Sequence, residues 1–206
     1  YSPELWRIMA AQGWMGLSIP TQHGGSGMSF LELALVLVEM GRVLLPSPFF
    51  ATVVLAADVI IRAGSERQRC KWIPRLVEGN LLATTAVAEK HGRWGSSGIE
   101  TVARRRGANF VLSGTKLYVP FGNAADLILI AAKVEGEDVP SFFALPKGSP
   151  GLVISELKTI GSERLSVVTI DDVPADASAL LPDTQNTINS IDSTMTRSVV
   201  GLCAWS

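Results

Sequence analysis

Residues 86–98, with the sequence AVAEKHGRWGSSG, hold the side chains of this chain that are best suited to chemistry. Six consecutive positions supply a carboxylate, an amine, an imidazole, a guanidinium and an indole, which belong to Glu89, Lys90, His91, Arg93 and Trp94. Such groups transfer protons, pair with anions and stack against rings. Because the stretch follows an apolar run, we interpret it as a catalytic loop, a ligand-binding loop or the remnant of one.

Residues 16–30, GLSIPTQHGGSGMSF, have the outline of a phosphate-binding loop, because a glycine-rich turn separates an apolar segment from a helix start. The spacing argues against phosphate binding: after Gly25 and Gly27, the third glycine of a G-x-G-x-x-G motif falls on Phe30. We therefore predict a tight turn that uses glycine at positive φ. His23 is predicted to lie on the surface and no metal site is assigned, since no second His or Cys stands at ligand spacing.

Two other charged clusters give no catalytic constellation. The arginines at 104–106 could contact phosphate, but a strand sends alternate side chains to opposite faces, so we predict a solvated edge. Asp171 and Asp172 precede Pro174 and are predicted to be turn residues. No catalytic carboxylate pair and no Ser/His/Asp or Cys/His set can be assembled, so no catalytic residue is assigned.

The composition limits the class of protein. A chain of 206 residues has room for two domains, and its 47% hydrophobic content predicts a surface that meets other protein in an oligomer. A net charge of −1 gives no attraction to nucleic acid or to an anionic membrane. Without a membrane-spanning run or a signal sequence, a cytoplasmic protein is expected. Cys70 and Cys203 are expected to be buried free thiols.

The first part of the chain has the apolar spacing of helices. Four helices are predicted at residues 2–12, 29–41, 48–64 and 65–79. Ser29 with Glu32, and Ser65 with Gln68, have the spacing of capping boxes at two of the helix starts. Pro74 is predicted to cut the last of the four helices, because proline lacks the backbone N–H and its ring clashes with the preceding turn.

From residue 81 onward, short β-rich runs are separated by Gly, Pro and Asn turns. The predicted strands lie within residues 81–89, 101–119, 126–134, 141–146, 151–158 and 165–173. Without alternation of strands and helices, this pattern favours an antiparallel sheet or barrel. The last stretch returns to helical spacing through Ile191, Met195, Val199 and Leu202, which predicts the first turns of a further helix.

Several of these stretches together resemble the acyl-CoA dehydrogenase family. Residues 5–42 are similar to its opening helix, its "GL..P...GG.G" turn and the long helix that follows; residues 64–89 are similar to its "GSEEQK..WLP.L..GE" run into the first strand. Residues 110–132 resemble its "L.G.K.(W/F)(I/V)T.G..AD" element, and residues 149–154 and 170–181 add two further matches. Each motif alone is modest, but five in order along the chain are specific.

The resemblance implies an α+β multidomain protein: an N-terminal helical domain at 1–79, an antiparallel β-barrel-like domain at 80–176, and at 177–206 a linker with the first helix of a C-terminal helical bundle. It also implies an acyl-CoA dehydrogenase-like flavoprotein subunit that desaturates an acyl-CoA thioester between its α and β carbons, with FAD as the hydride acceptor. The implied partners are an acyl-CoA substrate, other subunits in a homo- or hetero-oligomer and an electron-transfer flavoprotein. The carboxylate base lies in the family's C-terminal domain.

The family's flavin loop reads like "T-E-P-G-A-G-S-D", and its second flavin element reads "W-I-T". Aligned on these motifs, the residues implied to contact FAD are Val87, Ala88, Glu89, Arg93, Trp94, Tyr118, Val119 and Pro120. His91, Gly92 and Trp94 are implied to border the channel that holds the pantetheine of the substrate.

This chain departs from both motifs. Ala88 lacks the hydroxyl of the family's first threonine, and Pro120 has neither the hydroxyl nor the backbone N–H that serve flavin N5. Trp94 replaces a serine near the pyrophosphate, and Arg93 replaces a glycine but could pair with the diphosphate. Some bacterial members that act on bulky acyl groups, such as steroid side chains, pair two different subunits and keep one set of flavin sites. The alternative is therefore a non-catalytic partner with a decayed FAD site, which completes the acyl-CoA and FAD site of a paralogous subunit.

Overall fold

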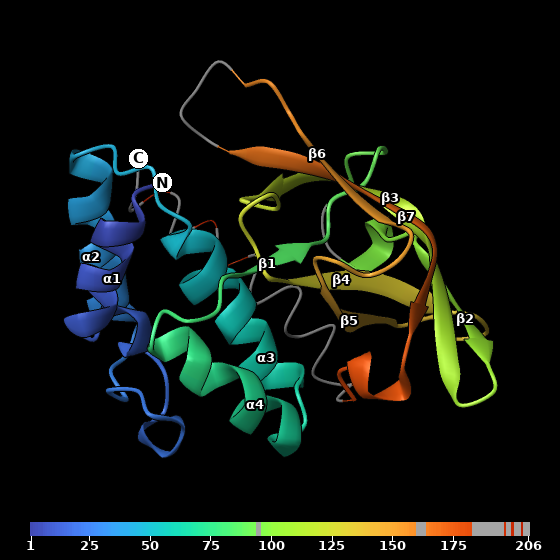
Figure 1. Ribbon diagram of the computed structural model, residues 1–206, viewed down its shortest axis with the longest axis horizontal. Helices are drawn as coiled ribbons and strands as arrows, with labels where there is room; N and C mark the ends of the chain where they lie inside the picture. Colours follow the sequence, from blue (N-terminus) through green and yellow to red (C-terminus); the bar gives the residue numbers. More distant parts are fainter. Residues whose placement is uncertain (94–95, 160–163, 183–195, 197–198, 200–202, 204–206) are drawn as a thin grey trace.

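The computed structural model describes residues 1–93, 96–159 and 164–182, together with Thr196, Val199 and Cys203. Helices occupy the first part of the chain and strands the second, and the two groups lie side by side (Figure 1). The helices are α1 (Pro3–Ala11), α2 (Phe30–Arg42), α3 (Ala57–Ala63) and α4 (Glu66–Val77), with a π-helical segment (Phe50–Ala56) that leads into α3. The strands are β1 (Ala83–Ala86), β2 (Val102–Arg106), β3 (Asn109–Pro120), β4 (Leu127–Val134), β5 (Pro140–Pro146), β6 (Leu152–Glu156) and β7 (Leu165–Ala175). The predicted α+β architecture, helices followed by a curled sheet, is confirmed.

Serine side chains begin three of the helices, and one of the two predicted capping boxes is complete. Ser2 and Ser29 accept hydrogen bonds from backbone N–H groups in the first turns of α1 and α2. At α4, Ser65 and Gln68 form a complete reciprocal capping box. These caps satisfy N–H groups that have no partner within the helix, and so they fix where each helix starts.

Pro74 does not cut the last helix, contrary to the prediction. α4 continues through Pro74 to Val77, and the neighbouring Ile73 and Leu76 are both buried. The apolar burial of these side chains offsets the loss of one backbone hydrogen bond in the last turn. The predicted helix over 48–64 is also modified, because its first half, Phe50–Ala56, has the wider π-helical geometry.

The seven strands form one mixed sheet, so the antiparallel prediction needs a correction. The strand order is β1-β4-β2-β3-β7-β6, and β5 pairs with the other edge of β4. The β3–β7, β2–β3, β4–β5 and β6–β7 pairings are antiparallel, whereas β4 pairs in parallel with both β1 and β2. β1 and β2 lie one after the other along the same edge of β4, because the chain leaves that edge after Ala86 and rejoins it at Val102.

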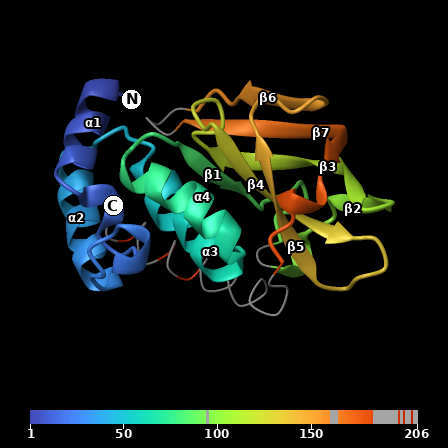
Figure 2. The ribbon, with the colours of Figure 1, turned by 60° about the horizontal axis from the view of Figure 1, so that its bottom comes forward.

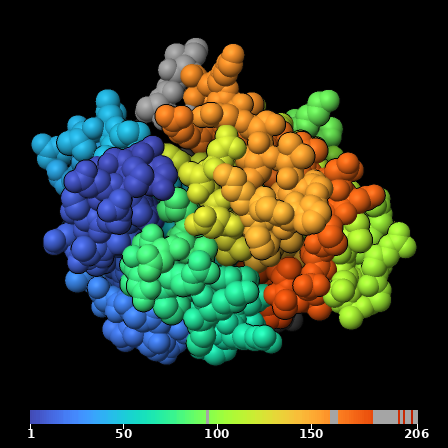
Figure 3. Space-filling model, in the orientation of Figure 1, coloured from blue at the N-terminus to red at the C-terminus, as the bar shows by residue number. Residues whose placement is uncertain are grey.

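The sheet has a buried core on both faces. On one face, strand residues such as Leu129 and Phe142 pack with Ile60 of α3 and Ile73 of α4. The other face is filled by residues of the curled sheet itself, among them Phe143. Figure 2 shows α3 and α4 lying close to the sheet, and the space-filling view in Figure 3 shows the two regions in continuous contact. The helices therefore anchor the sheet in which the candidate site lies.

Several predictions about single residues are wrong. Cys70 and Cys203 are exposed, not buried. Asp171 and Asp172 lie within β7, and Asp172 has a left-handed backbone with φ 46° at an irregularity of the β3–β7 pairing.

The arginines at 104–106 are exposed, as predicted. Most of the predicted C-terminal helix lies outside the described residues, and no described helix is long and apolar enough to cross a membrane.

Candidate functional site

The loop that the sequence singles out is closed at its base by one carboxylate. Glu89 is buried, and its two oxygens accept hydrogen bonds from the backbone N–H of Glu100 at 2.9 Å and of Thr101 at 3.0 Å. The Thr101 hydroxyl donates a third hydrogen bond to Glu89 at 2.8 Å. Glu89 and Thr101 thus join the two ends of the loop, which protrudes where β1 and β2 leave a gap along β4.

The same carboxylate forms a buried ion pair with Lys116 of β3. The Lys116 ammonium lies 2.6 Å from Glu89 Oε1, and the two side chains are 0% and 7% exposed. Lys116 also donates to the carbonyl of Val87 at 3.3 Å. One lysine therefore binds both the strand that enters the loop and the carboxylate that closes it.

Burial and the charge of the partner shift the pKa of each group of this ion pair in opposite directions. Burial lowers the pKa of Lys116 to about 8, despite the favourable charge of Glu89. Burial raises the pKa of Glu89, but the charge and hydrogen bond of Lys116 and the bonds from Thr101 outweigh it, so this pKa lies below its ordinary value. At neutral pH the pair is ionised, and it acts as an electrostatic clamp.

The second predicted element, residues 118–120, lies against the first. The N–H of Leu117 donates to the carbonyl of Ala88 at 2.9 Å, and the hydroxyl of Thr84 donates to the carbonyl of Pro120 at 2.6 Å. The β3–β7 register shifts between Lys116 and Val119, and Tyr118, one of the two residues between them, has φ 54°. The strained backbone turns Tyr118 into solvent, where it is 62% exposed.

The tip of the loop carries exposed polar side chains. Lys90, His91 and Arg93 are all exposed, and the imidazole of His91 lies 3.2 Å from the carboxylate of Glu100. Gly92 has φ 62°, which favours glycine. Trp94 lies outside the described residues.

An open pocket of about 320 Å³ adjoins the end of β3. Its lining is formed by Tyr1, Phe121, Asn123, Ala124, Glu156, Arg164 and Ser166. The Arg164 guanidinium is already paired with Glu156 at 3.2 Å, so the pocket does not offer it as a free cation.

The geometry is accompanied by clear similarity to known proteins. Residues 1–80 match the family model described as "Acyl-CoA dehydrogenase, N-terminal domain". Acyl-CoA dehydrogenase FadE12 of Mycobacterium tuberculosis is 30% identical over 188 residues, which cover 86% of this chain and 48% of the relative. The fold of the whole chain matches the ChsE4-ChsE5 complex from the same organism, with a TM-score of 0.87, 27% identity and 53% coverage of that chain.

This chain belongs to the acyl-CoA dehydrogenase family. A further match is a glutaryl-CoA dehydrogenase from Mycobacterium smegmatis in complex with FADH2, with a TM-score of 0.79 and 25% identity over 98% of this chain and 54% of that one. Members of the acyl-CoA dehydrogenase family bind FAD. The chain spans about half the length of the relatives it matches.

The two flavin elements expected from the acyl-CoA dehydrogenase resemblance are neighbours in space, but the carbonyls of the first are engaged within the protein. Those of Val87, Ala88 and Glu89 accept hydrogen bonds from Lys116, Leu117 and Gly92 respectively. Val119 is buried and pairs with Ser166 of β7, and Pro120 has no N–H to offer. We call residues 87–89 and 118–120 together the flavin wall. A flavin that lies against this wall would therefore meet the exposed ring of Tyr118 and the backbone N–H groups of residues 87–89.

Sequence reasoning missed the side chains of Lys116 and Thr101 and the buried contacts of the Glu89 carboxylate, whereas the implied contact of Glu89 with FAD stays a prediction. A weak signal for Lys116 exists, because it lies an even number of residues from the apolar Phe110 and Leu112 of the same strand, both of which are buried. His23 was also misjudged, since it is 5% exposed and not on the surface.

Proposed function

We propose that this chain is a subunit of a flavin-dependent acyl-CoA dehydrogenase that introduces an α,β double bond into an acyl-CoA thioester, within an oligomer. The observation that carries the proposal is the convergence of Val87–Glu89 with Tyr118–Pro120 beside one loop, in a chain of this family. FAD, when bound, accepts a hydride from the β-carbon of the acyl group. The base that removes the α-proton would belong to the C-terminal domain of the family.

The residues of this chain would bind and orient. The exposed ring of Tyr118 would stack on the flavin, and the backbone N–H groups of Val87–Glu89 would face its pyrimidine edge, where negative charge collects on reduction. Arg93 would pair with the diphosphate. Trp94 would lie at the same end of the cofactor.

The substrate would pass along the tip of the loop. His91 and Gly92, with Trp94, would border the pantetheine channel, and the pairing of His91 with Glu100 would hold the imidazole in place. Closure of the loop by Glu89 and Lys116 would keep these residues at the edge of the cofactor wall. The clamp is a positioning device, since its charged atoms are buried.

An apolar face supports assembly into an oligomer. Leu31, Leu35 and Val38 lie along one side of α2 and are 67%, 60% and 38% exposed. Exposed large apolar side chains at helical spacing favour contact with further protein. The ChsE4-ChsE5 complex, a structural match named for two components, supports a heteromeric assembly. An electron-transfer flavoprotein is the proposed electron acceptor.

A second candidate function is that of a non-catalytic partner whose own FAD site has decayed. It is favoured by the absence of a donor at Pro120 and of a hydroxyl at Ala88, the positions where the family motif carries threonines. In this reading the chain completes the acyl-CoA and FAD site of a paralogous subunit.

Cofactor stoichiometry distinguishes the two functions. The full-length protein would be purified alone and after co-expression with a paralogous subunit, and FAD per chain and acyl-CoA turnover would be measured. One FAD per chain with turnover of the protein alone supports the first function, whereas FAD confined to the mixed complex, at one per heterodimer, supports the second. Absence of FAD and turnover from both preparations would contradict both.

Substitution of Tyr118 tests where the flavin binds. If the wall holds the flavin, Tyr118→Ala lowers FAD occupancy and shifts the flavin absorption spectrum. The matched control is Val153→Ala on β6, which also removes an exposed side chain, 56% exposed, and is expected to leave both unchanged. Equal effects of the two changes would argue against a flavin beside Tyr118.

A further inference from the structure

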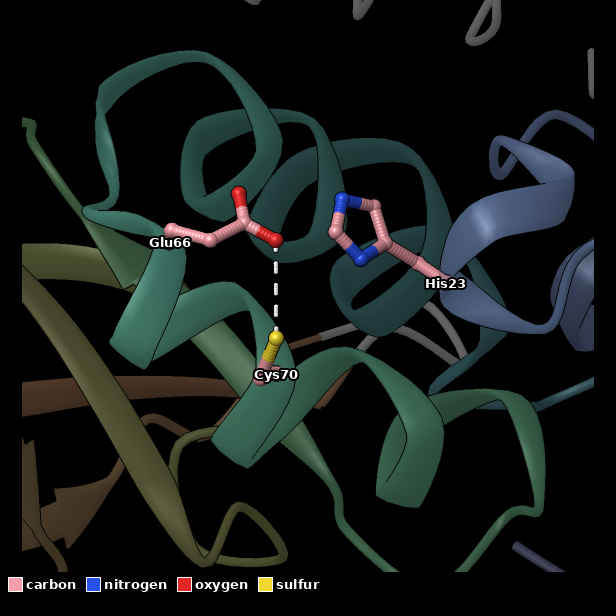
Figure 4. A group of neighbouring side chains, drawn as sticks. All are labelled: His23, Glu66 and Cys70. Atoms are coloured by element: carbon pink, nitrogen blue, oxygen red, sulfur yellow. Dashed lines mark hydrogen bonds between the residues drawn. The ribbon is translucent and has the colours of Figure 1, made fainter.

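Away from the loop, the structure gathers a second set of reactive side chains. Among the described residues, His23, Glu66 and Cys70 bring one ligand atom each within 4.8 Å of one another. Figure 4 shows the His23 ring, from the glycine-rich turn, facing Glu66 and Cys70 on α4. Neither the proposed flavin wall nor the substrate channel uses any of the three.

We propose that His23, Glu66 and Cys70 form a site for a zinc-like divalent transition metal, which joins the glycine-rich turn to α4. The donors are an imidazole nitrogen, a carboxylate oxygen and a thiolate sulfur, a mixed set that suits zinc and cobalt(II) rather than magnesium or calcium. Because Glu66 and Cys70 are exposed, water can fill the fourth position of a tetrahedral ion.

The spacing of the donors is close to that of a tetrahedral site. Zinc bonds of about 2.0–2.3 Å put neighbouring tetrahedral ligands about 3.3–3.8 Å apart. The Cys70 sulfur lies 3.5 Å from Glu66 Oε1, so one edge of the tetrahedron is already formed. Glu66 and Cys70 are four residues apart on α4 and therefore share one face, and rotation of their exposed side chains can close the remaining distances.

His23 is held in place before any metal binds. It ends a short 3₁₀ turn, Thr21–His23, and its N–H donates to the carbonyl of Pro20 at 2.9 Å. Its side chain is 5% exposed, and the Gln22 amide lies 3.4 Å from Nε2. The burial of the ring limits the positions that the imidazole can take.

Glu66 is oriented as well. Its Oε2 lies 3.5 Å from the guanidinium of Arg69, which leaves Oε1 directed toward Cys70. Without an ion, Cys70 is a thiol that donates to Glu66 Oε1, so a bound divalent cation takes the place of that proton, which is released to solvent. The thiolate and the carboxylate then supply two negative charges to the ion.

Metal titration tests the site. The full-length protein, treated with chelator and in the presence of a thiol reductant, would be titrated with zinc against a chromogenic chelator and with cobalt(II) in an absorption cell. We expect one zinc per chain, a rise in the thermal midpoint with zinc, and a thiolate-to-cobalt absorption band. Cys70→Ser is expected to abolish the band and to weaken zinc binding by about 100-fold or more, since loss of an outer partner alone costs about 10–100-fold.

Matched variants separate the site from incidental thiol binding. Cys203→Ser removes the other cysteine of the chain and is expected to leave the stoichiometry and the band unchanged. Cys70→His keeps a metal ligand, so it should retain zinc and lose the cobalt–thiolate band. His23→Gln should weaken zinc binding while the melting curve in chelator stays within a few degrees of the parent.

Three outcomes would overturn the metal site. They are a protein that binds no zinc, equal zinc affinities of the parent and Cys70→Ser, and loss of the band in Cys203→Ser. FAD per chain is measured on the same samples. The outcome for zinc is therefore read separately from that for the flavin.

Discussion

Two glycine-containing loops of this protein are held in different ways. The turn of residues 16–28 is fixed by its own backbone: Ser26, Gly27 and Met28 donate N–H groups to the carbonyls of residues 16, 19 and 17 at 2.8–2.9 Å. The loop between Glu89 and Thr101 is fixed by one carboxylate and a lysine 27 positions away in the chain. The first loop is rigid through local turn chemistry, whereas the second depends on a long-range ion pair that single changes can remove.

The largest expected effect is the loss of that ion pair. Lys116→Met leaves the Glu89 carboxylate buried without its charge partner, so the free energy of unfolding should fall by about 3–5 kcal/mol. Denaturant unfolding measures this change. The double change Lys116→Met with Glu89→Gln should be less damaging than Lys116→Met alone, because no unpaired charge remains.

The matched control is Lys90→Met, which changes an exposed lysine in the same loop. It should alter the free energy of unfolding by about 0.5 kcal/mol or less. Equal losses for Lys90→Met and Lys116→Met would show that the ion pair does not hold the loop.

The contrast between the two loops also decides what the sequence could predict. The glycine-rich turn was predicted, because its signals are local: Gly24 and Gly27 have φ of 86° and 65°. The helix starts at Ser29 and Ser65 were predicted for the same reason. The clamp between Glu89 and Lys116 was not, since a charged residue in a strand normally indicates a solvated face.

Other failures have the same origin. The burial of His23 and the exposure of Cys70 depend on how the turn packs against α4, which no spacing along the chain records. The parallel pairing of β4 with β1 and β2 was hidden because no helix connects these strands. The two stretches that the family resemblance implies to contact FAD, residues 87–89 and 118–120, do lie next to each other in the structure.

The clamp should make stability depend on pH on the acid side. Since the folded pKa of Glu89 lies below its ordinary value of 4.5, the stabilisation is complete above that pH and is lost as the pH falls through the folded pKa. Lys116, with a pKa of about 8, stays protonated throughout this range. Thermal midpoints from pH 7 downward should therefore converge for the parent and Glu89→Gln as the pH falls, and parallel curves would contradict the assignment.

A smaller effect is expected from crowding the glycine-rich turn. A Cβ on Gly25 would lie 2.1 Å from the carbonyl oxygen of Ile19, and backbone must move to accept it. Gly25→Ala should lower the free energy of unfolding by about 1–3 kcal/mol. Gly148→Ala is the control, because its Cβ meets nothing within 4 Å and the change should stay within about 0.5 kcal/mol. A neutral Gly25→Ala would mean that the turn is looser than its hydrogen bonds indicate.

The smallest effect is expected from the cap that Ser65 and Gln68 form at the start of α4. Ser65→Ala removes one half of the capping box, so the free energy of unfolding should fall by about 1 kcal/mol. Gln68 also donates to the carbonyls of Ser178 and Leu180, so the cap supports a contact with a distant segment. Ser2→Ala, at the cap of α1, lacks such a box and should cost less in the same denaturant titration. If Ser2→Ala lowers the free energy of unfolding by as much as Ser65→Ala, the second hydrogen bond of the capping box adds no stability to that of a single-bond cap. The start of α4 is then held by the glycine-rich turn alone.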